Sequence, residues 1–421
     1  MSPGTVVQAP HDTEPPAVLP RIRWLMIGLA FLATVINYLD RQTLSVVAPV
    51  LREELGMSNI TYSRILFAFM LAYTISNGLS GALIDRLGTR IGYALAMAWW
   101  SAATVLHSVA TGAWSLGVYR FLLALGEAGN WPAAVKVVAE WFPPRERAFA
   151  SGIFNSGSSI GAVIAPPLVA WILLTWGWPA AFVVSGLTGF LWLAVWLTVY
   201  RTPPAVEREI AATQLSIRKL LNTRFVWSFT LAKSFMDPVW YFYIFWFPSY
   251  LKDARGFDIA AIGKFAWIPF LAADVGNLLG GWFAGVLLRR GVGNTLARKS
   301  AVLLFACIMT AAIPAVLVAQ VWLSIALISL AMLGYTASTA NMLAFPADVF
   351  RKREVGSVWG LASVGSGSGG MLFALLTGWI VEHHSYVPAF ALFGILPLVC
   401  AAIIWFLLGP LRPIEPEAGE S

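Results

Sequence analysis

Four ionisable side chains lie inside segments of this sequence that are otherwise apolar. Asp40 and Arg41 are adjacent in the stretch NYLDRQT, which long uncharged runs flank on both sides. Arg120 and Glu127 lie seven residues apart in another apolar run, so on a helix they share one face about 10 Å apart. Ionisable groups in the middle of a bilayer nearly always face a cavity or a partner. We therefore expect these four side chains to lie inside the protein and close together.

Two roles for these charges are open. Glu127 lies too far along the helix from Arg120 for a direct ion pair, so Asp40 is the expected partner of Arg120. The first possibility is a structural ion pair that locks two helices together. The second, which we favour for Arg120 and Glu127, is a part in transport.

Other polar and aromatic side chains in apolar runs could bind a small hydroxylated ligand: Tyr73, Asn155, Ser158, Lys233, Asp237, Trp240, Tyr243, Asn341, Ser363 and Ser366. Each also has an ordinary structural explanation. Serine beside glycine, as in 155–159, is common where membrane helices pack closely. Lys233 and Asp237 are four residues apart and could neutralise each other. The aromatic residues that follow them could form a belt at the membrane interface.

The composition predicts the elements that position these residues. Of the 421 residues, 58% are hydrophobic and 12% are charged, whereas a soluble chain is about 25% charged. Apolar runs recur at the length of about 20 residues that a helix needs to cross a bilayer. We expect an all-α polytopic membrane protein with twelve spans, near 24–50, 62–84, 91–110, 115–139, 148–174, 180–200, 226–251, 262–288, 299–319, 321–346, 356–381 and 387–409.

The polar segments between the spans predict domains and orientation. The longest of them divides the spans six and six, and most of the 28 lysines and arginines fall in segments on the same side as the N-terminus. Because basic loops stay in the cytoplasm, both termini should be cytoplasmic. The expected organisation is a disordered tail 1–20, a six-helix bundle 21–200, a cytoplasmic linker 201–224, a second six-helix bundle 225–410 and a cytoplasmic tail 411–421.

The two halves repeat each other. When the chain is shifted by 208 residues, segment 139–171 falls on 347–379 without a gap, and several glycines, a serine and a tryptophan match. An even number of spans in each half keeps both in one orientation. The pattern indicates two bundles related by an axis along the membrane normal.

The segment after the second span, GALIDRLGTR, resembles the G-x-L-x-D-R-x-G-R signature of the major facilitator superfamily. Its residues Gly81, Asp85, Arg86, Gly88 and Arg90 are a candidate gate. The glycines allow a tight turn, and the carboxylate can accept hydrogen bonds from arginine or a helix N-terminus. The equivalent segment of the second half, 285–291, lacks the acid, so such a gate would be asymmetric.

Several functional classes are not supported by any motif. The histidines offer no set of three convergent metal ligands, and neither a Walker loop nor a nucleophile elbow is present. We expect no metal, no cofactor and no enzymatic activity. The net charge of +7 is explained by cytoplasmic loops, so no nucleic-acid partner is expected.

The span region as a whole resembles the anion:cation symporter group of the major facilitator superfamily, and within it the bacterial hexuronate transporters. The stretches that carry the likeness are LGTRIGYAL from 87, EWFPPRERAFASGIFNSGSSIGAVIAPPLV from 140, DPVWYFYIFW from 237 and FAWIPFLAADVGNLLGG from 265. The resemblance implies a protein of the bacterial inner membrane. We expect it to be monomeric and in contact with lipid. It would import a hexuronate together with a proton by alternating access.

The resemblance also implies roles for individual residues. Asp40 and Glu127 match the acids that take part in proton coupling. Arg41 and Arg120 match arginines that handle charge and the substrate carboxylate, and Tyr38 matches a position lining the site, as does Tyr73. In the expected mechanism, the anion binds Arg120 and releases Asp40, which then takes up a proton.

The substrate class has an alternative. The chain could carry another organic anion, such as an aldonate like galactonate, an aldarate like glucarate, or an aromatic carboxylate. Galactonate-type members have a glutamine where this chain has Ser158, and this departure favours a hexuronate.

Overall fold

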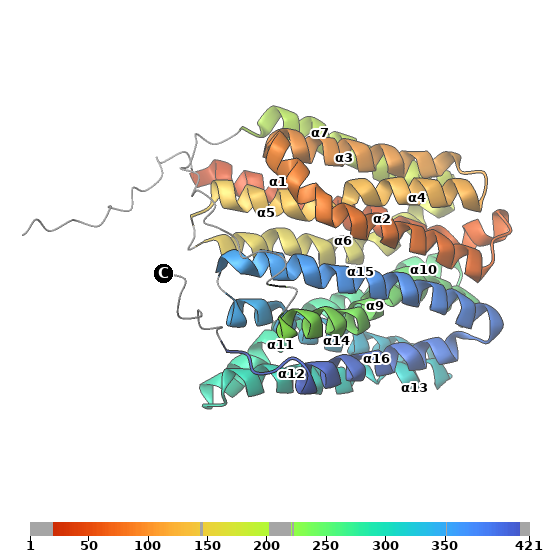
Figure 1. Cartoon of the computed structure of the whole chain (residues 1–421). Coiled ribbons are helices and arrows are strands. Elements are labelled where there is room, and N and C mark those ends of the chain that lie inside the picture. The colour runs from red at the N-terminus through yellow and green to blue at the C-terminus, as the bar shows by residue number, and fades with distance from the viewer. Residues whose placement is uncertain (1–19, 144–145, 202–219, 221–222, 351, 413–421) are drawn as a thin grey trace, which may run out of the picture.

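The computed structural model describes residues 20–143, 146–201, 220, 223–350 and 352–412. All the regular secondary structure of these residues is helical (Figure 1). The helices are α1 (Pro20–Glu54), α2 (Asn59–Leu87), α3 (Thr89–Leu106), the 3-10 turn η1 (His107–Val109), α4 (Ala113–Glu127), α5 (Asn130–Trp141), α6 (Arg147–Trp176), α7 (Trp178–Val199), α9 (Arg224–Asp253), α10 (Ile259–Phe265), α11 (Ile268–Arg289), α12 (Asn294–Met309), α13 (Ala312–Leu317), α14 (Val321–Val349), α15 (Lys352–His383) and α16 (Tyr386–Phe406).

The predicted spans correspond to these helices with local differences. Among the described residues, nine segments are long and apolar enough to cross a membrane, and α3, α4 with α5, and α9 occupy the remaining predicted positions. Three predicted spans are each broken into two helices, at 128–129, 266–267 and 310–311. The last two breaks precede Pro269 and Pro314, whose rings cannot continue a helix from the preceding turn.

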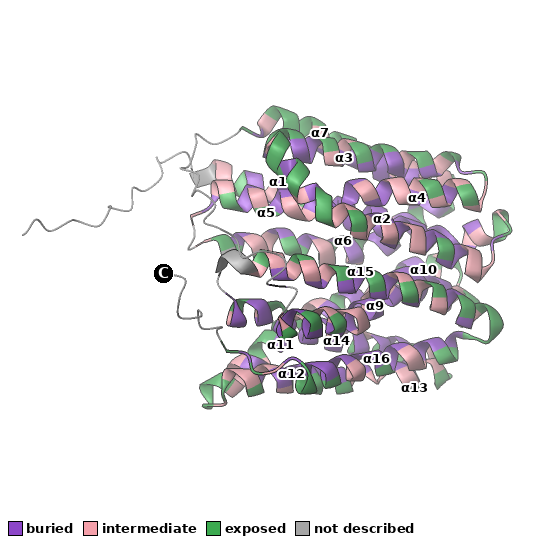
Figure 2. Cartoon of the chain, viewed as in Figure 1, coloured by how far each residue is buried: buried purple, intermediate pink, exposed green. Residues whose placement is uncertain are grey.

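The exposed surface is that of a membrane protein. Figure 2 shows exposed positions along the outward faces of the helices, and large apolar side chains occupy many of them, including Leu278, Trp282 and Leu372. Charged side chains such as Arg120 and Glu127 are fully buried instead. Apolar residues outside and charges inside suit a lipid environment. The prediction of a multi-pass, all-α membrane protein is therefore confirmed.

Helices α1–α7 lie on one side of the molecule and α9–α16 on the other (Figure 1). Contacts between the two sides run from α2 to α15, from α1 to α9, and from α6 to α10 and α11. We call this boundary the seam. The end of the molecule where α1 begins and α16 ends is called the base, and the end where α1 ends and α2 begins is called the tip. The predicted tails 1–20 and 411–421 and the linker 201–224 lie almost entirely outside the described residues.

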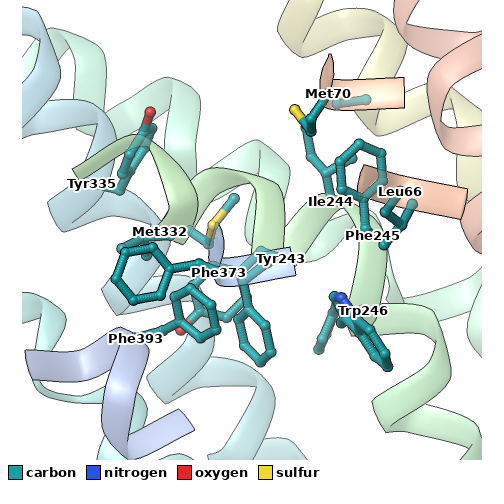
Figure 3. Packing of buried hydrophobic residues seen from close by; sticks show 14 of the residues in the cluster. Leu66, Met70, Tyr243, Ile244, Phe245, Trp246, Met332, Tyr335, Phe373 and Phe393 are labelled. Atoms are coloured by element: carbon teal, nitrogen blue, oxygen red, sulfur yellow. The ribbon is translucent and has the colours of Figure 1, made fainter. Parts of the chain in front are cut away.

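An apolar core fills the seam toward the tip. Figure 3 shows side chains of α2, α9, α14, α15 and α16 packed together there. Tyr62 of α2 stacks edge-on against Trp246 of α9, with ring centroids 5.2 Å apart, and its hydroxyl donates to the Phe245 carbonyl. Tyr243, a predicted ligand contact, belongs to this core and is 1% exposed. Its ring packs against Phe242 and Phe390.

The repeat-related glycines perform the same packing task in both halves. A Cβ on Gly161 of α6 would lie 2.6 Å from the Val35 carbonyl of α1, and one on Gly369 of α15 would lie 2.2 Å from the Ser234 carbonyl of α9. Only glycine allows these helices to approach so closely. The glycine-rich runs therefore position α1, which carries Asp40 and Arg41, and α9, which carries Lys233 and Asp237.

Gly161→Ala should destabilise the protein by about 1–3 kcal/mol, the usual cost of forcing extra volume into a packed contact. The matched control is Gly152→Ala on the same helix, where a Cβ meets nothing within 4 Å. Thermal unfolding of the purified proteins in detergent measures the difference. Equal unfolding temperatures for the two variants would show that the α1–α6 contact does not depend on glycine.

Candidate functional site

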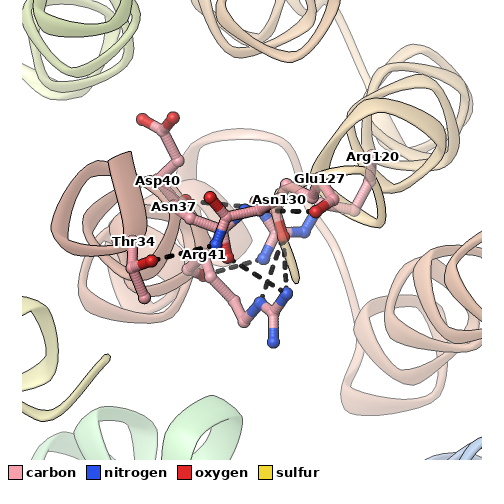
Figure 4. A network of polar contacts seen from close by, with 7 residues as sticks. All are labelled: Thr34, Asn37, Asp40, Arg41, Arg120, Glu127 and Asn130. Atoms are coloured by element: carbon pink, nitrogen blue, oxygen red, sulfur yellow. Dashed lines mark hydrogen bonds and ion pairs between the residues drawn. The ribbon is translucent and has the colours of Figure 1, made fainter. Parts of the chain in front are cut away.

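The centre of the first half is a buried ion pair between α1 and α4. The Arg41 guanidinium donates from Nε and Nη2 to one carboxylate oxygen of Glu127, at 3.1 Å and 2.8 Å (Figure 4). The Arg41 side chain is 3% exposed and that of Glu127 is 0% exposed. Removing one member of such a pair strands a charge in a low-dielectric interior, so the two side chains act as a unit.

Among the described residues, no carboxylate forms an ion pair with Arg120. Its Nη2 donates to the backbone carbonyl of Arg41 at 2.7 Å, and its Nη1 lies 3.5 Å from the carbonyl of Asp40. The guanidinium also covers the ring of Phe69 at 4.6 Å. The predicted ion pair between Arg120 and Asp40 is therefore wrong. Arg120 therefore holds the α1 backbone in place at Asp40 and Arg41.

Asp40 lies apart from the arginines. Figure 4 shows its carboxylate and the Arg41 guanidinium pointing away from α1 in different directions. It accepts a short hydrogen bond from Ser185 of α7, and the residue is 0% exposed. The side chains of adjacent residues of a helix point about 100° apart, so Asp40 and Arg41 lie in two different environments.

Two asparagines that we did not predict complete the network around the ion pair. The Asn37 side chain lies 3.5 Å from both Arg41 Nη2 and the Glu127 carbonyl. Asn130 donates to Thr34 at 3.2 Å and accepts from the Tyr93 hydroxyl at 2.7 Å. The sequence held a signal for both, because Asn37 lies one helical turn before Arg41 and Asn130 closely follows Glu127.

Three aromatic rings surround the Arg41 guanidinium. Its central carbon lies 5.1 Å from the Tyr38 ring, 5.3 Å from the Phe69 ring and 4.8 Å from the Tyr73 ring. Cation–π contacts of this kind stabilise a guanidinium that has lost its water. Tyr38 and Tyr73 thus lie together with Arg41, as expected. Tyr38 also faces Trp240 of α9 across the seam.

The second half supplies polar groups from α9, α14 and α15. Lys233 pairs with Asp237 at 2.7 Å, so these two charges do neutralise each other. Trp240 stacks on Tyr335, with ring centroids 5.3 Å apart and planes 17° apart. Tyr335, which sequence analysis missed, also faces Asp237.

Ser366 of α15 lies near the seam. Its hydroxyl is 3.3 Å from that of Tyr241, one of the aromatic residues that follow Asp237. Tyr335 belongs to a run that looks like ordinary apolar helix, and only the rotation of the helix brings its hydroxyl to the seam.

Several other candidates do not join this cluster. Ser158 and Ser363 donate to carbonyls of their own helices. Asn341 donates to the Gly280 and Ala337 carbonyls and so fastens α14 to α11. Asn155 is exposed. Within the described residues, no group of three or more His, Cys, Asp or Glu side chains could hold a metal ion.

Comparison with known proteins decides the family. The model of the Major Facilitator Superfamily matches residues 30–297 and 283–421. The chain belongs to the Major Facilitator Superfamily. It is 34% identical over 414 residues to the hexuronate transporter of Escherichia coli strain K12, covering 94% of this chain and 96% of that one. It is 35% identical over 307 residues to the galacturonate transporter of Dickeya chrysanthemi, covering 68% of this chain and 89% of the other.

A solved structure shows the same fold. The D-xylose-proton symporter superposes with a TM-score of 0.77 at 13% identity, covering 92% of this chain and 98% of the other. The family and the fold are those of membrane transporters and not of enzymes.

The segment that resembles the superfamily signature lies at the base. Gly88, with φ of 77°, forms the turn between α2 and α3, and Gly81 approaches Pro132 of α5. Asp85 accepts from Lys136 of α5 at 2.8 Å. Arg90 donates to the Leu197 carbonyl of α7 at 2.7 Å, whereas the neighbouring Arg86 is exposed. These contacts all stay within the first half.

Charges from both halves pair at the tip of this Major Facilitator protein. Arg52 of α1 pairs with Asp253 of α9 at 2.6 Å, and Lys252 pairs with Glu53 at 2.6 Å. Among the described residues, these are the ion pairs that cross the seam. The tip is therefore the end of the molecule at which ion pairs join the two halves.

Proposed function

We propose that this protein is a symporter that imports a hexuronate together with a proton by alternating access. Two six-helix bundles, 21–200 and 225–410, rock about the seam. The base faces the cytoplasm, with both termini there, and the tip faces the outside of the bacterial inner membrane. The similarity to hexuronate and galacturonate transporters supports the substrate class, and the basic loops support the orientation. The protein acts as a monomer in lipid.

The observation that carries the proposal is the position of Arg41. Its guanidinium is held by one carboxylate and flanked by Tyr38 and Tyr73, and Tyr38 faces Trp240 across the seam. A uronate carries one carboxylate and several hydroxyls, which suit a guanidinium and tyrosine hydroxyls. We assign the substrate carboxylate to Arg41, and we place Arg120 behind it as the residue that fixes α1.

Coupling follows from competition for one guanidinium. When the substrate carboxylate binds Arg41, it displaces Glu127 from its cationic partner. A buried carboxylate without such a partner is costly as an anion, so Glu127 takes up a proton. The pair returns when substrate and proton leave, and no covalent chemistry is needed.

The second half completes the site. Lys233 and Asp237, as a neutral pair, offer both donors and acceptors for sugar hydroxyls, and Trp240 on Tyr335 provides a flat face. Ser366, with Tyr241, adds hydroxyls. The residues at 81–90 act as the gate at the base, and Asp85 holds α2 to α5 through Lys136.

Uptake by purified protein in proteoliposomes tests the proposal. Labelled glucuronate or galacturonate should accumulate when the outside is acidic, and a protonophore should abolish the accumulation. Unlabelled hexuronates should compete better than galactonate, glucarate or an aromatic acid. Stronger competition by any of these other acids would overturn the assignment of substrate, and accumulation that ignores the protonophore would overturn proton coupling.

A further inference from the structure

A second buried polar cluster lies inside the first half, away from the seam. It begins at Asp40, whose carboxylate accepts from Ser185 and is turned away from the Arg41–Glu127 pair (Figure 4). The Thr43 hydroxyl lies 3.5 Å from the Ser185 hydroxyl. All three residues are at most 3% exposed. Asp40 therefore does not open directly to the place where we expect the substrate.

The cluster continues along α3 toward the tip. Ser101 and Thr104 lie three residues apart on α3, and His107 follows after three more residues in η1. Thr104 faces the Asp40 carboxylate. Ser101 faces α7, because a Cβ added to Gly189 of α7 would clash with the Ser101 hydroxyl. His107 is fully buried, and the loop 110–112 at the tip follows it closely.

Three atoms of this cluster need hydrogen-bond partners that the described part of the chain does not supply. The second Asp40 oxygen, the Ser101 hydroxyl and His107 Nε2 are buried without a hydrogen-bond partner among the described residues. His107 Nδ1 lies 2.7 Å from the Ala103 carbonyl, and a carbonyl only accepts, so Nδ1 carries the proton and Nε2 is an acceptor. Buried polar atoms of this kind are normally satisfied by internal water.

We propose that Asp40 is a second proton site beside Glu127, and that protons reach and leave it through this hydroxyl path between α3 and α7, separately from the route of the substrate. The path consists of Ser185, Thr104 and Ser101 with internal water, and His107 forms its end near the tip. A proton moves from water along the hydroxyls to the Asp40 carboxylate and returns to water by the same groups. The inference rests on the proposed proton symport, and it adds a proton route that is distinct from the Arg41–Glu127 pair.

Two transport modes separate proton access from substrate movement. Accumulation driven by a pH gradient requires a proton to enter and leave in each cycle. Exchange of labelled for unlabelled hexuronate needs only the loaded protein to reorient, so the proton can stay in place. Ser185→Ala and Thr104→Val should slow gradient-driven uptake by roughly tenfold or more, the factor for one lost hydrogen bond to a charged group. Exchange should stay close to that of the wild type.

Two further variants serve as controls. Thr104→Ser keeps the hydroxyl and should therefore keep gradient-driven uptake. Thr104→Val keeps the shape of the threonine side chain but lacks the hydroxyl. Ser80→Ala removes a buried hydroxyl of the same half that donates to the Ala128 carbonyl, and it should slow neither mode. Amounts of folded protein are compared by gel filtration before reconstitution.

The outcomes are distinct. Selective loss of gradient-driven uptake, restored by Thr104→Ser, supports the path. Equal loss of both modes, or no loss in either, overturns it. If the wild type itself shows no uptake driven by a pH gradient, the proposed symport fails before the path is tested.

Discussion

Glu127→Gln should abolish accumulation of hexuronate against its gradient and leave exchange largely intact. The amide can still accept a hydrogen bond from Arg41, but it cannot pick up or release a proton. In proteoliposomes, an imposed pH gradient should therefore drive no accumulation, while preloaded hexuronate should still exchange for labelled substrate. Loss of coupling without loss of binding is the signature of a proton carrier.

The control for this variant is Glu140→Gln. Glu140 is an acid of the same half, but it accepts from Thr89 and Tyr200 near the base and does not contact Arg41. It should keep gradient-driven accumulation. Accumulation at the wild-type level in Glu127→Gln would remove Glu127 from the coupling mechanism.

Arg41→Gln should lose hexuronate binding and also destabilise the protein. The change removes the guanidinium that we assign to the substrate carboxylate, and it leaves Glu127 buried without its partner. Breaking a buried pair on one side costs about 3–5 kcal/mol. Isothermal titration with glucuronate measures the first effect, and thermal unfolding in detergent measures the second.

The double variant Arg41→Gln, Glu127→Gln separates the two effects. Because it removes both charges, it should recover most of the lost stability but none of the binding. If the double variant binds hexuronate as the wild type does, the substrate carboxylate does not bind Arg41. If the single variant is as stable as the wild type, the buried ion pair does not stabilise the folded protein.

The sequence was sufficient for the fold class because hydropathy reports directly on membrane spans. It was also sufficient to place Arg41 and Glu127 inside the protein, since an ionisable residue in a span must be sheltered. The breaks in three spans were not predictable in the same way. The break after Glu127, for example, accompanies packing of Gly126 against Trp100 of α3, where a Cβ would lie 2.9 Å away. That contact depends on the tertiary structure.

The prediction of which charges pair was wrong for a related reason. Helical spacing gives the depth of a residue but not the rotation of its helix relative to a neighbour. Asp40 and Arg41 differ by one residue, so a small error in rotation exchanges their surroundings. We predicted an ion pair between Asp40 and Arg120. In the structure, α1 instead directs Arg41 toward Glu127 and Asp40 toward Ser185. Tyr335 was missed because helix rotation, not sequence, brings it to the seam.

The central claim is that the substrate carboxylate displaces Glu127 from Arg41 and that Glu127 then takes up a proton. The most direct test adds glucuronate to purified protein in weakly buffered detergent solution and records proton uptake with a pH indicator. The account predicts uptake when the wild type binds glucuronate, and none when Glu127→Gln binds it. Equal uptake by both proteins, or none by a wild type that binds glucuronate, would contradict the account.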